Sequence, residues 1–259
     1  MPTKGSNKVS QYIIDGVTAK LNALGVADFY YAIVPTDQSG LVKKMGRSAK
    51  FYFGNLSSQK KMRFAVVSDT KILKFREEFL NRFTKLDCRF LYSIPPSYDE
   101  GNPVYHPPFK LFSDRHQKAI EYIWSKYEIG CAATTYHSIE GNSDWIGIFH
   151  LFFREHQQDT KQLLEPIEQE LFSLLQEYSE IFVAHAHQDI NPIANFGLLS
   201  SNCVKILEMA ADGDSSEEIG KKLFLSERGV NYHLDRAREI LDARNRTNLV
   251  SKAYKKGLL

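Results

Sequence analysis

The sequence predicts an α+β N-terminal domain, in which helices cover the faces of an antiparallel sheet, followed by a small all-α C-terminal domain. Three observations lead to this prediction. Residues 1–187 alternate between strand-like and helix-like apolar spacing, residues 198–259 hold four short helical patterns, and residues 188–197 are rich in turn-forming residues. We therefore expect two domains joined by a linker over residues 188–197.

The overall composition excludes several classes of protein. The chain has 259 residues, 43% hydrophobic and 25% charged, which fits two folded domains and excludes disordered, collagen-like and coiled-coil sequences. The longest apolar stretch, Trp145–Phe153, is about half of what a membrane-spanning helix needs, and Met1–Ser10 lacks the apolar core of an export signal. The three cysteines, Cys88, Cys131 and Cys203, are odd in number and far apart in the sequence, a pattern that favours neither a disulfide framework nor a CxxC metal site. We expect a cytoplasmic protein with no membrane partner.

Strand and helix signals alternate along the N-terminal half. Apolar spacing predicts a helix over Tyr12–Leu24 with Gly25 as its C-terminal cap, and aromatic and β-branched residues predict a strand over Phe29–Val34. The turn residues of Ser138–Ser143 indicate an antiparallel hairpin between the last two of the remaining strands. Those strands are expected at Met62–Ser68, Ile129–Tyr136 and Trp145–Phe153.

Two further helices and a loop complete the N-terminal half. Phe75, Phe79 and Phe83 fall four residues apart, as on one face of a helix. Apolar residues at spacings of three and four predict one long helix over Asp159–His187, bent or begun at its single proline. The proline-rich stretch Pro95–Pro108 is expected to be a loop.

The C-terminal region has the pattern of a helix-turn-helix. Its helices are expected over Leu199–Ala211, from Ser215 onward, over Glu227–Leu241 and over Arg246–Lys256. Ser215 and Glu218 have the spacing of a capping box, and the short turn Phe224–Ser226 separates the second helix from the third. The third helix has an apolar inner stripe and a polar outer face, as a DNA-recognition helix does.

This C-terminal pattern resembles the DNA-binding domain of LuxR-type transcriptional regulators over residues 196–259. The resemblance rests on Gly213, Glu218, Ile219, Leu223, Leu225, Ser226, Glu227, Val230, His233, Leu234, Asn245, Arg246, Thr247, Val250, Ala253, Gly257 and Leu258. The sequence departs from the family where Asn202, Cys203 and Lys205 replace an arginine and two acidic residues, and where Gly229 replaces a common threonine. Glycine at that helix start costs up to about 1 kcal/mol relative to alanine.

The charge of the last helices favours a DNA partner. Residues 226–259 hold eight basic and four acidic side chains, a net charge of +4, which favours phosphate binding over a merely solvated helix face. Asn231, Tyr232 and Asp235 are placed to reach base edges, where Asn can read adenine and Asp can accept from cytosine. Phosphate contacts are predicted at Lys221, Lys222, Arg228, Arg236 and Arg246.

The resemblance also implies a two-fold homodimer on double-stranded DNA. Helix-turn-helix domains of this type read two half-sites about 10 base pairs apart. The apolar stripe of Asp159–His187 is the candidate dimer contact, and packing of that stripe on its own sheet is the alternative.

By resemblance, the N-terminal half is similar to the family's signal-binding domain, an α/β/α sandwich that holds N-acyl homoserine lactones in many members. Leu24–Tyr31 and Tyr127–Ile129 carry this likeness. Lactone receptors have a Trp-x-x-x-Tyr pair followed by Asp-Pro, whose carboxylate accepts the amide proton of the ligand. No Asp-Pro dipeptide occurs in this chain, and phenylalanines, which lack a hydroxyl or indole N–H, take the aromatic positions. The expected signal is therefore a small apolar molecule other than a typical lactone.

Three alignments of the signal-binding segment stay open. With Phe75 and Phe79 as the aromatic pair, Cys88 takes the aspartate position without a gap, and Asp87 takes it with a one-residue deletion. With the next pair, which ends at Phe83, Tyr92 takes that position instead. The expected ligand-binding residues are Phe75, Phe79, Phe83, Asp87, Cys88, Tyr92, Phe109, Leu111, Ala132 and Tyr136.

Two alternatives to a signal-sensing regulator follow from the same residues. The aromatic residues also suit an ordinary core, in which case the N-terminal domain serves dimerisation and needs no ligand. A metal-dependent enzyme is the competing class, with His185, His187 and Asp189 as candidate ligands, although a polar helix end explains them better. The sequence has no GxSxG, HExxH, Walker or GxGxxG motif, so we predict no catalytic residue and no cofactor.

Overall fold

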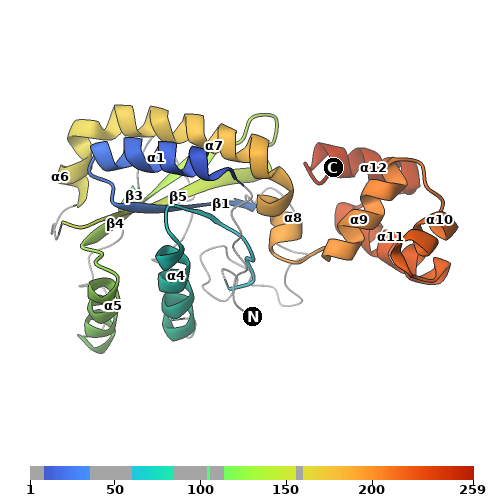
Figure 1. Cartoon of the computed structure of the whole chain (residues 1–259), viewed down its shortest axis with the longest axis horizontal. Helices are drawn as coiled ribbons and strands as arrows, with labels where there is room; N and C mark the ends of the chain where they lie inside the picture. Colours follow the sequence, from blue (N-terminus) through green and yellow to red (C-terminus); the bar gives the residue numbers. More distant parts are fainter. Residues whose placement is uncertain (1–8, 36–59, 84–103, 106–113, 156–159) are drawn as a thin grey trace.

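The computed structural model describes residues 9–35, 60–83, 104–105, 114–155 and 160–259, and it has the predicted α+β part and all-α part (Figure 1). Five strands form one antiparallel sheet in the order β2-β1-β5-β4-β3. Their bounds are Asp28–Pro35 for β1, Val66–Val67 for β2, Val104–Tyr105 for β3, Cys131–Ser138 for β4 and Trp145–Phe153 for β5. The hairpin of β4 and β5 confirms the prediction from its turn residues.

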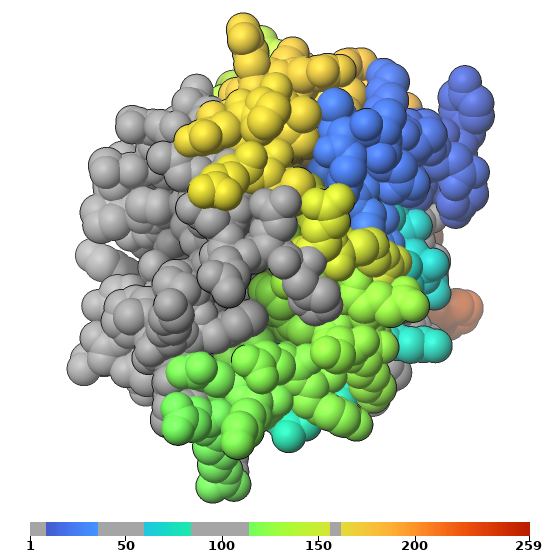
Figure 2. Space-filling view, turned by 90° about the vertical axis from the view of Figure 1, so that its left-hand side faces the viewer, coloured from blue at the N-terminus to red at the C-terminus, as the bar shows by residue number. Residues whose placement is uncertain are grey.

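Helices cover both faces of this sheet. Helices α1 and α7 lie on one face and α4 and α5 on the other (Figure 1), and Figure 2 shows the layers from the end of the sheet, with α1 and α6 above the strands and α5 below them. The bounds are Gln11–Ala23 for α1, Thr70–Phe83 for α4, Asp114–Lys126 for α5, Thr160–Leu164 for α6 and Glu168–Ile190 for α7. The predicted α/β/α sandwich is confirmed.

The central strands are buried on both faces because successive side chains of a strand point to opposite sides of a sheet. Every residue of β1 and β5 is buried. Phe29 and Phe149 pack in the core that includes α1 and α7, whereas Tyr30 and Phe152 pack in the core that includes α4 and α5. The sheet therefore separates two distinct apolar layers.

Polar contacts hold α7 on its side of the sheet. The hydroxyls of Tyr31 and Ser179 lie 2.9 Å apart in the buried interface. Gly147 of β5 makes this approach possible, because a Cβ there would lie 2.8 Å from both hydroxyl oxygens. Of the apolar stripe that we expected as a dimer contact, Leu171 and Tyr178 are buried on this side of the sheet, whereas Leu174 and Ile181 are only partly buried.

A second polar contact on the same face involves a buried histidine. His137 of β4 lies 2.8 Å from the hydroxyl of Thr135 through Nε2 and 3.2 Å from the amide oxygen of Gln176 on α7 through Nδ1. Burial lowers the pKa of His137 to about 4, and the hydrogen bond with Gln176 offsets part of this shift. The histidine is therefore neutral in the folded protein near neutral pH.

Two asparagines connect the two parts of the chain at helix α8, Pro192–Asn195. Asn195 accepts from the backbone N–H groups of Arg63 and Phe64 at 2.9 and 2.7 Å and donates to the Phe64 carbonyl. Asn191 donates to the carbonyls of Lys256 and Gly257 at the end of the chain, at 2.6 and 3.1 Å. The predicted linker is thus a buried corner that bonds to both sides.

The C-terminal part consists of four helices beyond this corner (Figure 1). They are α9 over Ser201–Ala211, α10 over Ser216–Leu223, α11 over Glu227–Leu241 and α12 over Arg246–Lys255. Their core is continuous with the α1 and α7 layer through Ile190, Ile193 and Leu199. Lys256, just after α12, forms an ion pair with Asp144 in the loop before β5.

Several predicted boundaries in the N-terminal half are wrong. The strand over Met62–Ser68 shrinks to Val66–Val67, because the backbone before it bonds to Asn195 instead of to another strand. The long helix over Asp159–His187 is divided into α6 and α7 by a 3-10 turn, Glu165–Ile167, and this turn contains Pro166, the proline at which we expected the helix to bend or begin.

Other differences come from elements that local spacing did not reveal. α5 was not predicted, and β3 falls inside the proline-rich stretch that we expected to be a loop. α7 extends to Ile190, and Pro192 begins α8 at a position where its missing N–H costs nothing. Among the described residues, no helix is both long and apolar enough to cross a membrane.

We predict that the free energy of unfolding falls by about 3 kcal/mol between pH 6.5 and pH 4 because of His137 alone. The unfolded histidine binds a proton near pH 6.5, whereas the folded one, with a pKa of about 4, does not. Denaturant unfolding across this range should show a smaller pH dependence for His137→Gln than for the wild type. The matched change His185→Gln, at an exposed position, should leave the pH dependence intact, and equal slopes for all three proteins would contradict the prediction.

Candidate nucleic-acid interface and ligand-binding face

The helix pair α10 and α11 begins with the predicted capping interactions. The Ser215 hydroxyl accepts from the N–H of Glu218 at 3.3 Å, and the Glu218 carboxylate accepts from the N–H of Ser215 at 2.7 Å. These hydrogen bonds lower the pKa of Glu218. The reciprocal pair is a capping box, which the spacing of the two residues predicted.

A tight turn places α11 against α10. Phe224 ends α10 in the left-handed region, with φ of 57°, and Ser226 caps α11 by accepting from the N–H of Gly229 at 3.1 Å. Gly220 is required for this approach, because a Cβ there would lie 2.7 Å from the carbonyl oxygen of Leu225. The turn therefore fixes the angle between the two helices.

The first helix of the C-terminal part departs from the family at Cys203, which has a structural role. Its thiol donates to the carbonyl of His233 on α11 at 3.3 Å, and burial raises its pKa to about 11. The thiol thus remains protonated and joins α9 to α11.

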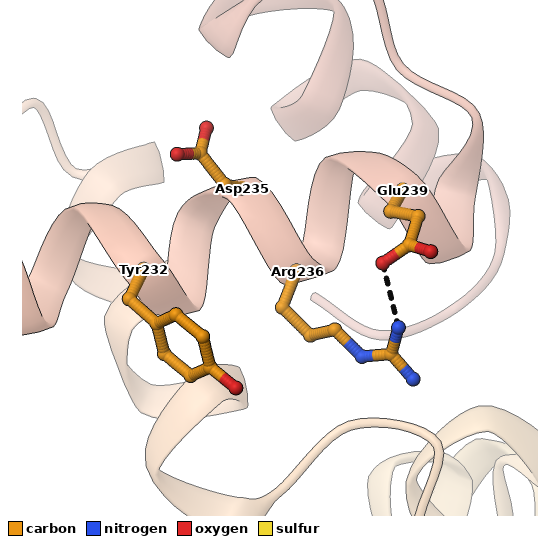
Figure 3. Close-up of a pocket in the computed structure, with 4 residues that line it drawn as sticks. All are labelled: Tyr232, Asp235, Arg236 and Glu239. Atoms are coloured by element: carbon orange, nitrogen blue, oxygen red, sulfur yellow. Dashed lines mark hydrogen bonds and ion pairs between the residues drawn. The ribbon is translucent and has the colours of Figure 1, made fainter.

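Helix α11 is divided into a buried and an exposed side. Val230, Leu234 and Ala237 are buried, as the apolar spacing predicted. The expected base-reading residues lie on the exposed side: Asn231, Tyr232 and Asp235. A hollow of about 400 Å³ along this side is lined by Tyr232, Asp235, Arg236 and Glu239. Figure 3 shows how these four side chains project from α11.

Ion pairs within α11 orient its exposed charges. Arg236 contacts Glu239 at 2.6 Å (Figure 3), and Arg238 contacts Asp235 at 3.1 Å. Both pairs are largely exposed, so each contributes little to stability.

The other predicted phosphate contacts differ in their surroundings. Lys221 and Lys222 form ion pairs with Glu217 and Asp214, at 2.7 and 2.6 Å, and Arg228 is exposed. Arg246 is half-buried, and its guanidinium donates to the Asp214 carbonyl and, at 3.4 Å, to the Ser216 hydroxyl. Arg246 therefore holds the loop before α10, a role that its charge alone did not indicate.

The structure brings together the expected ligand-binding residues that it describes. Phe75, Phe79, Phe83, Ala132 and Tyr136 all belong to the core between the sheet and helices α4 and α5. The ring centroids of the phenylalanines are 5.7 Å apart for the first pair and 4.7 Å for the second. The other expected residues, Asp87, Cys88, Tyr92, Phe109 and Leu111, lie outside the described residues.

A row of polar side chains that we did not predict crosses the sheet on this face. Tyr30 of β1 pairs with His150 of β5, which in turn pairs with Thr134 of β4, and all three are buried. The Thr134 hydroxyl lies 2.8 Å from Nδ1 of His150, and the rings of His150 and Tyr30 are 4.3 Å apart. Arg76 of α4 is also buried beside this row.

Burial determines the charge state of this polar row. It raises the pKa of Tyr30, and the charge and hydrogen bond of Arg76 offset part of that rise. Burial also raises the pKa of Tyr136 to about 12. Both phenols are therefore neutral. In the sequence, Thr134 alternates with Ala132 and Tyr136, which indicates that it lies on the same face of the strand as these two residues. The partners of Thr134 could be identified only from the strand register.

The candidate metal ligands do not converge in the described part of the chain. Nδ1 of His185 lies 2.8 Å from the carbonyl oxygen of Ile181, one helical turn earlier. Among the described residues, no three His, Cys, Asp or Glu side chains are grouped as a metal ion would require.

Comparison with known families identifies the C-terminal part. Residues 198–253 match the family described as bacterial regulatory proteins, luxR family. The C-terminal domain is thus a LuxR-family helix-turn-helix domain, which confirms the resemblance seen in the sequence.

Two curated relatives match this part of the chain. The HTH-type quorum sensing-dependent transcriptional regulator RpaR of Rhodopseudomonas palustris is 43% identical over 68 residues, which are 26% of this chain and 28% of RpaR. The oxygen regulatory protein NreC of Staphylococcus haemolyticus is 35% identical over 79 residues, which are 30% of this chain and 36% of NreC. The chain therefore spans about a third or less of the length of these relatives.

Two solved structures are similar over most of the chain. Escherichia coli SdiA aligns with a TM-score of 0.45 and 15% identity, covering 96% of this chain and 91% of SdiA. SdiA in complex with octanoyl-rac-glycerol aligns with a TM-score of 0.43 and 14% identity, covering 95% of this chain and 88% of that one.

We predict that Arg246→Ala lowers the free energy of unfolding by about 1 to 3 kcal/mol, because it removes charge-assisted hydrogen bonds to the loop before α10. The exposed Arg228 serves as the control, and Arg228→Ala should change stability by no more than about 0.5 kcal/mol. Urea unfolding of both variants measures the difference. Equal effects would mean that Arg246 has no structural role.

Proposed function

We propose that this chain, whose C-terminal domain is a LuxR-family helix-turn-helix domain, is a DNA-binding transcriptional regulator that acts as a homodimer and senses a small apolar signal. The observation that carries the DNA-binding function is the exposed side of α11. This side of the helix, which Ser226 caps at its N-terminus, exposes Asn231, Tyr232 and Asp235. Two arginines of the same helix, Arg228 and Arg236, are exposed as well. Side chains at the start of a recognition helix read base edges, and cations beside them bind phosphates.

The homodimer is proposed from the way such domains read DNA. Two copies bind two half-sites about one helical turn apart, so the symmetry of the site matches that of the protein. Two members of the predicted α7 stripe, Leu171 and Tyr178, are buried within one chain, so the contact between copies is left to its half-buried members, such as Leu174 and Ile181.

The signal is proposed to bind between the sheet and helices α4 and α5. This layer is mostly apolar and contains a few polar side chains, Arg76, Tyr30, Thr134 and His150, as small-molecule sites do. The names of the relatives point to different inputs, quorum sensing for RpaR and oxygen for NreC, and both match only the DNA-binding domain. The chemistry of the signal therefore depends on this chain's own residues.

A regulator that needs no ligand is the second candidate. Phe75, Phe79 and Phe83 contact one another through their rings, as residues of a closed core do. In that case the N-terminal domain serves dimerisation.

We predict that the protein binds duplex DNA with an affinity that falls steeply with salt concentration. Binding to phosphates releases counterions, so each lost cationic contact reduces the slope of log K against log salt by about one. Arg228→Ala combined with Arg236→Ala should reduce the slope by about two in a fluorescence anisotropy series. Lys74→Ala, an exposed lysine on α4, is the control and should leave the slope unchanged. A flat salt response of the wild type would rule out the proposed function.

We predict that N-acyl homoserine lactones of several chain lengths do not raise the melting temperature. The aromatic positions hold phenylalanines, and no Asp-Pro is present to accept the ligand amide. A ligand at a hundredfold excess over its Kd stabilises the native state by about 2.7 kcal/mol, which a melting scan detects. A dose-dependent rise with any lactone would overturn the prediction, and loss of that rise in Asp87→Asn would identify Asp87 as the acceptor. Stabilisation by an apolar cell extract would favour another signal over the ligand-independent regulator.

A further inference from the structure

We propose that Ser216 and Arg246 are positioning residues for DNA recognition, because together they fix the side chain of Asn231 before it meets a base. This inference rests on the proposed DNA-binding function and deepens it, since it names two residues that act on base reading through a third. It also gives Arg246 a role that differs from the phosphate contact expected from its charge.

The contact to Asn231 joins the two helices of the helix-turn-helix. Ser216, the first residue of α10, has its hydroxyl oxygen 2.7 Å from Oδ1 of Asn231 on α11. An amide oxygen has no hydrogen to give, so the hydroxyl is the donor. The cap of α10 is Ser215, one residue earlier. The Ser216 side chain is therefore not needed to begin the helix, and its hydroxyl is directed to Asn231.

Arg246, the first residue of α12, holds the Ser216 hydroxyl in this orientation. Its Nη1 donates to the Ser216 hydroxyl oxygen at 3.4 Å, and its Nη2 donates to the backbone carbonyl of Asp214. The Asp214 carboxylate also accepts from Nζ of Lys222 at 2.6 Å. A guanidinium can only donate, so the hydroxyl accepts from Arg246 and has its single hydrogen left for Asn231. The start of α12 is thus connected to the recognition helix through the start of α10.

The three side chains differ in exposure in a way that suits this role. Arg246 and Ser216 are half-buried, whereas Asn231 is exposed. An exposed asparagine without such a contact samples several rotamers, and ordering it on binding costs free energy. Residues that make precise contacts are held in place by hydrogen bonds from the residues behind them. The half-buried pair therefore orders the side chain that faces outward.

The hydrogen bond from Ser216 leaves Asn231 able to read a base. An amide oxygen has two lone pairs, and Ser216 uses one of them, so the other can accept from the amino group of adenine. An N–H group of Nδ2 can at the same time donate to adenine N7. The contact thus orients the amide without selecting among the bases, and its loss should weaken specific binding.

A double-mutant cycle on DNA affinity tests the proposal with the full-length protein. The probe is a duplex that the wild type selects from random sequence. Ser216→Ala should raise the Kd for this duplex about threefold to tenfold, the usual cost of ordering one side chain on binding. Asn231→Ala should raise the Kd as well, and Ser216→Ala should have no further effect in the Asn231→Ala protein.

Arg246→Lys separates a positioning role from a phosphate contact. Lysine keeps the positive charge but lacks the planar fork that reaches Asp214 and Ser216 together. A positioning role predicts the same threefold to tenfold rise in Kd, again absent in the Asn231→Ala protein. Affinity for a duplex of unrelated sequence, which depends on phosphate contacts, should stay at the wild-type value.

Two further variants are the controls. Ser216→Thr keeps a hydroxyl at this position and should bind like the wild type. Ser201→Ala is matched in position, because Ser201 is the first residue of α9 and follows a capping serine, Ser200, as Ser216 follows Ser215. It should leave the Kd unchanged. Melting curves verify that every variant remains folded.

Several results would overturn the inference while leaving the proposed function intact. Equal effects of Ser216→Ala with and without Asn231 would mean that Ser216 acts on its own. A Kd that is not raised in Ser216→Ala or in Asn231→Ala would remove the coupling altogether. For Arg246, a Kd that is not raised in Arg246→Lys, or an equal loss on the unrelated duplex, would exclude the positioning role. Failure of the wild type to enrich any sequence would instead contradict the proposed function itself.

Discussion

The burial of the central strands on both faces is the constraint on which the rest of the N-terminal part depends. Every residue of β1 and β5 is removed from water, so each face of the sheet requires a cover of helices. On one face the covering helix α7 is fixed by buried polar contacts, Tyr31 with Ser179 and His137 with Gln176. The other face carries α4, α5 and the polar row, which is why we propose that layer for the signal.

The corner at α8 extends this constraint to the DNA-binding domain. Asn195 bonds to the backbone that leads into β2, and Asn191 bonds to the carbonyls at the end of the chain. Phe196 lies in the core of the α4 and α5 layer, while Ile193 lies in the core shared with the helix-turn-helix. Buried amides of this kind are costly to leave without hydrogen bonds, so the corner holds one arrangement of both parts.

The sequence predicted the elements whose signals are local. The hairpin of β4 and β5, the capping box at Ser215 and the buried stripe of α11 follow from turn residues, caps and apolar spacing, and the structure confirms them. It did not predict that the strand before α4 has only two residues, because a contact distant in sequence, between Asn195 and the backbone before that strand, decides its length. The site shows the same limit. Spacing placed Asn231 and Asp235 on the exposed side of α11, but the hydrogen bond from Ser216 and the polar row beside Arg76 depend on side chains brought together only by folding.

The central claim is that α11 enters the major groove of duplex DNA as part of a two-fold dimer, and methylation protection tests it most directly. Dimethyl sulfate modifies guanine N7 in the major groove and adenine N3 in the minor groove, the atoms that these two grooves expose. On a selected site, the protein should protect guanine N7 in two patches about 10 base pairs apart, centre to centre, and leave adenine N3 within those patches reactive. Protection of adenine N3 alone, or of a single patch at saturating protein, would contradict the account.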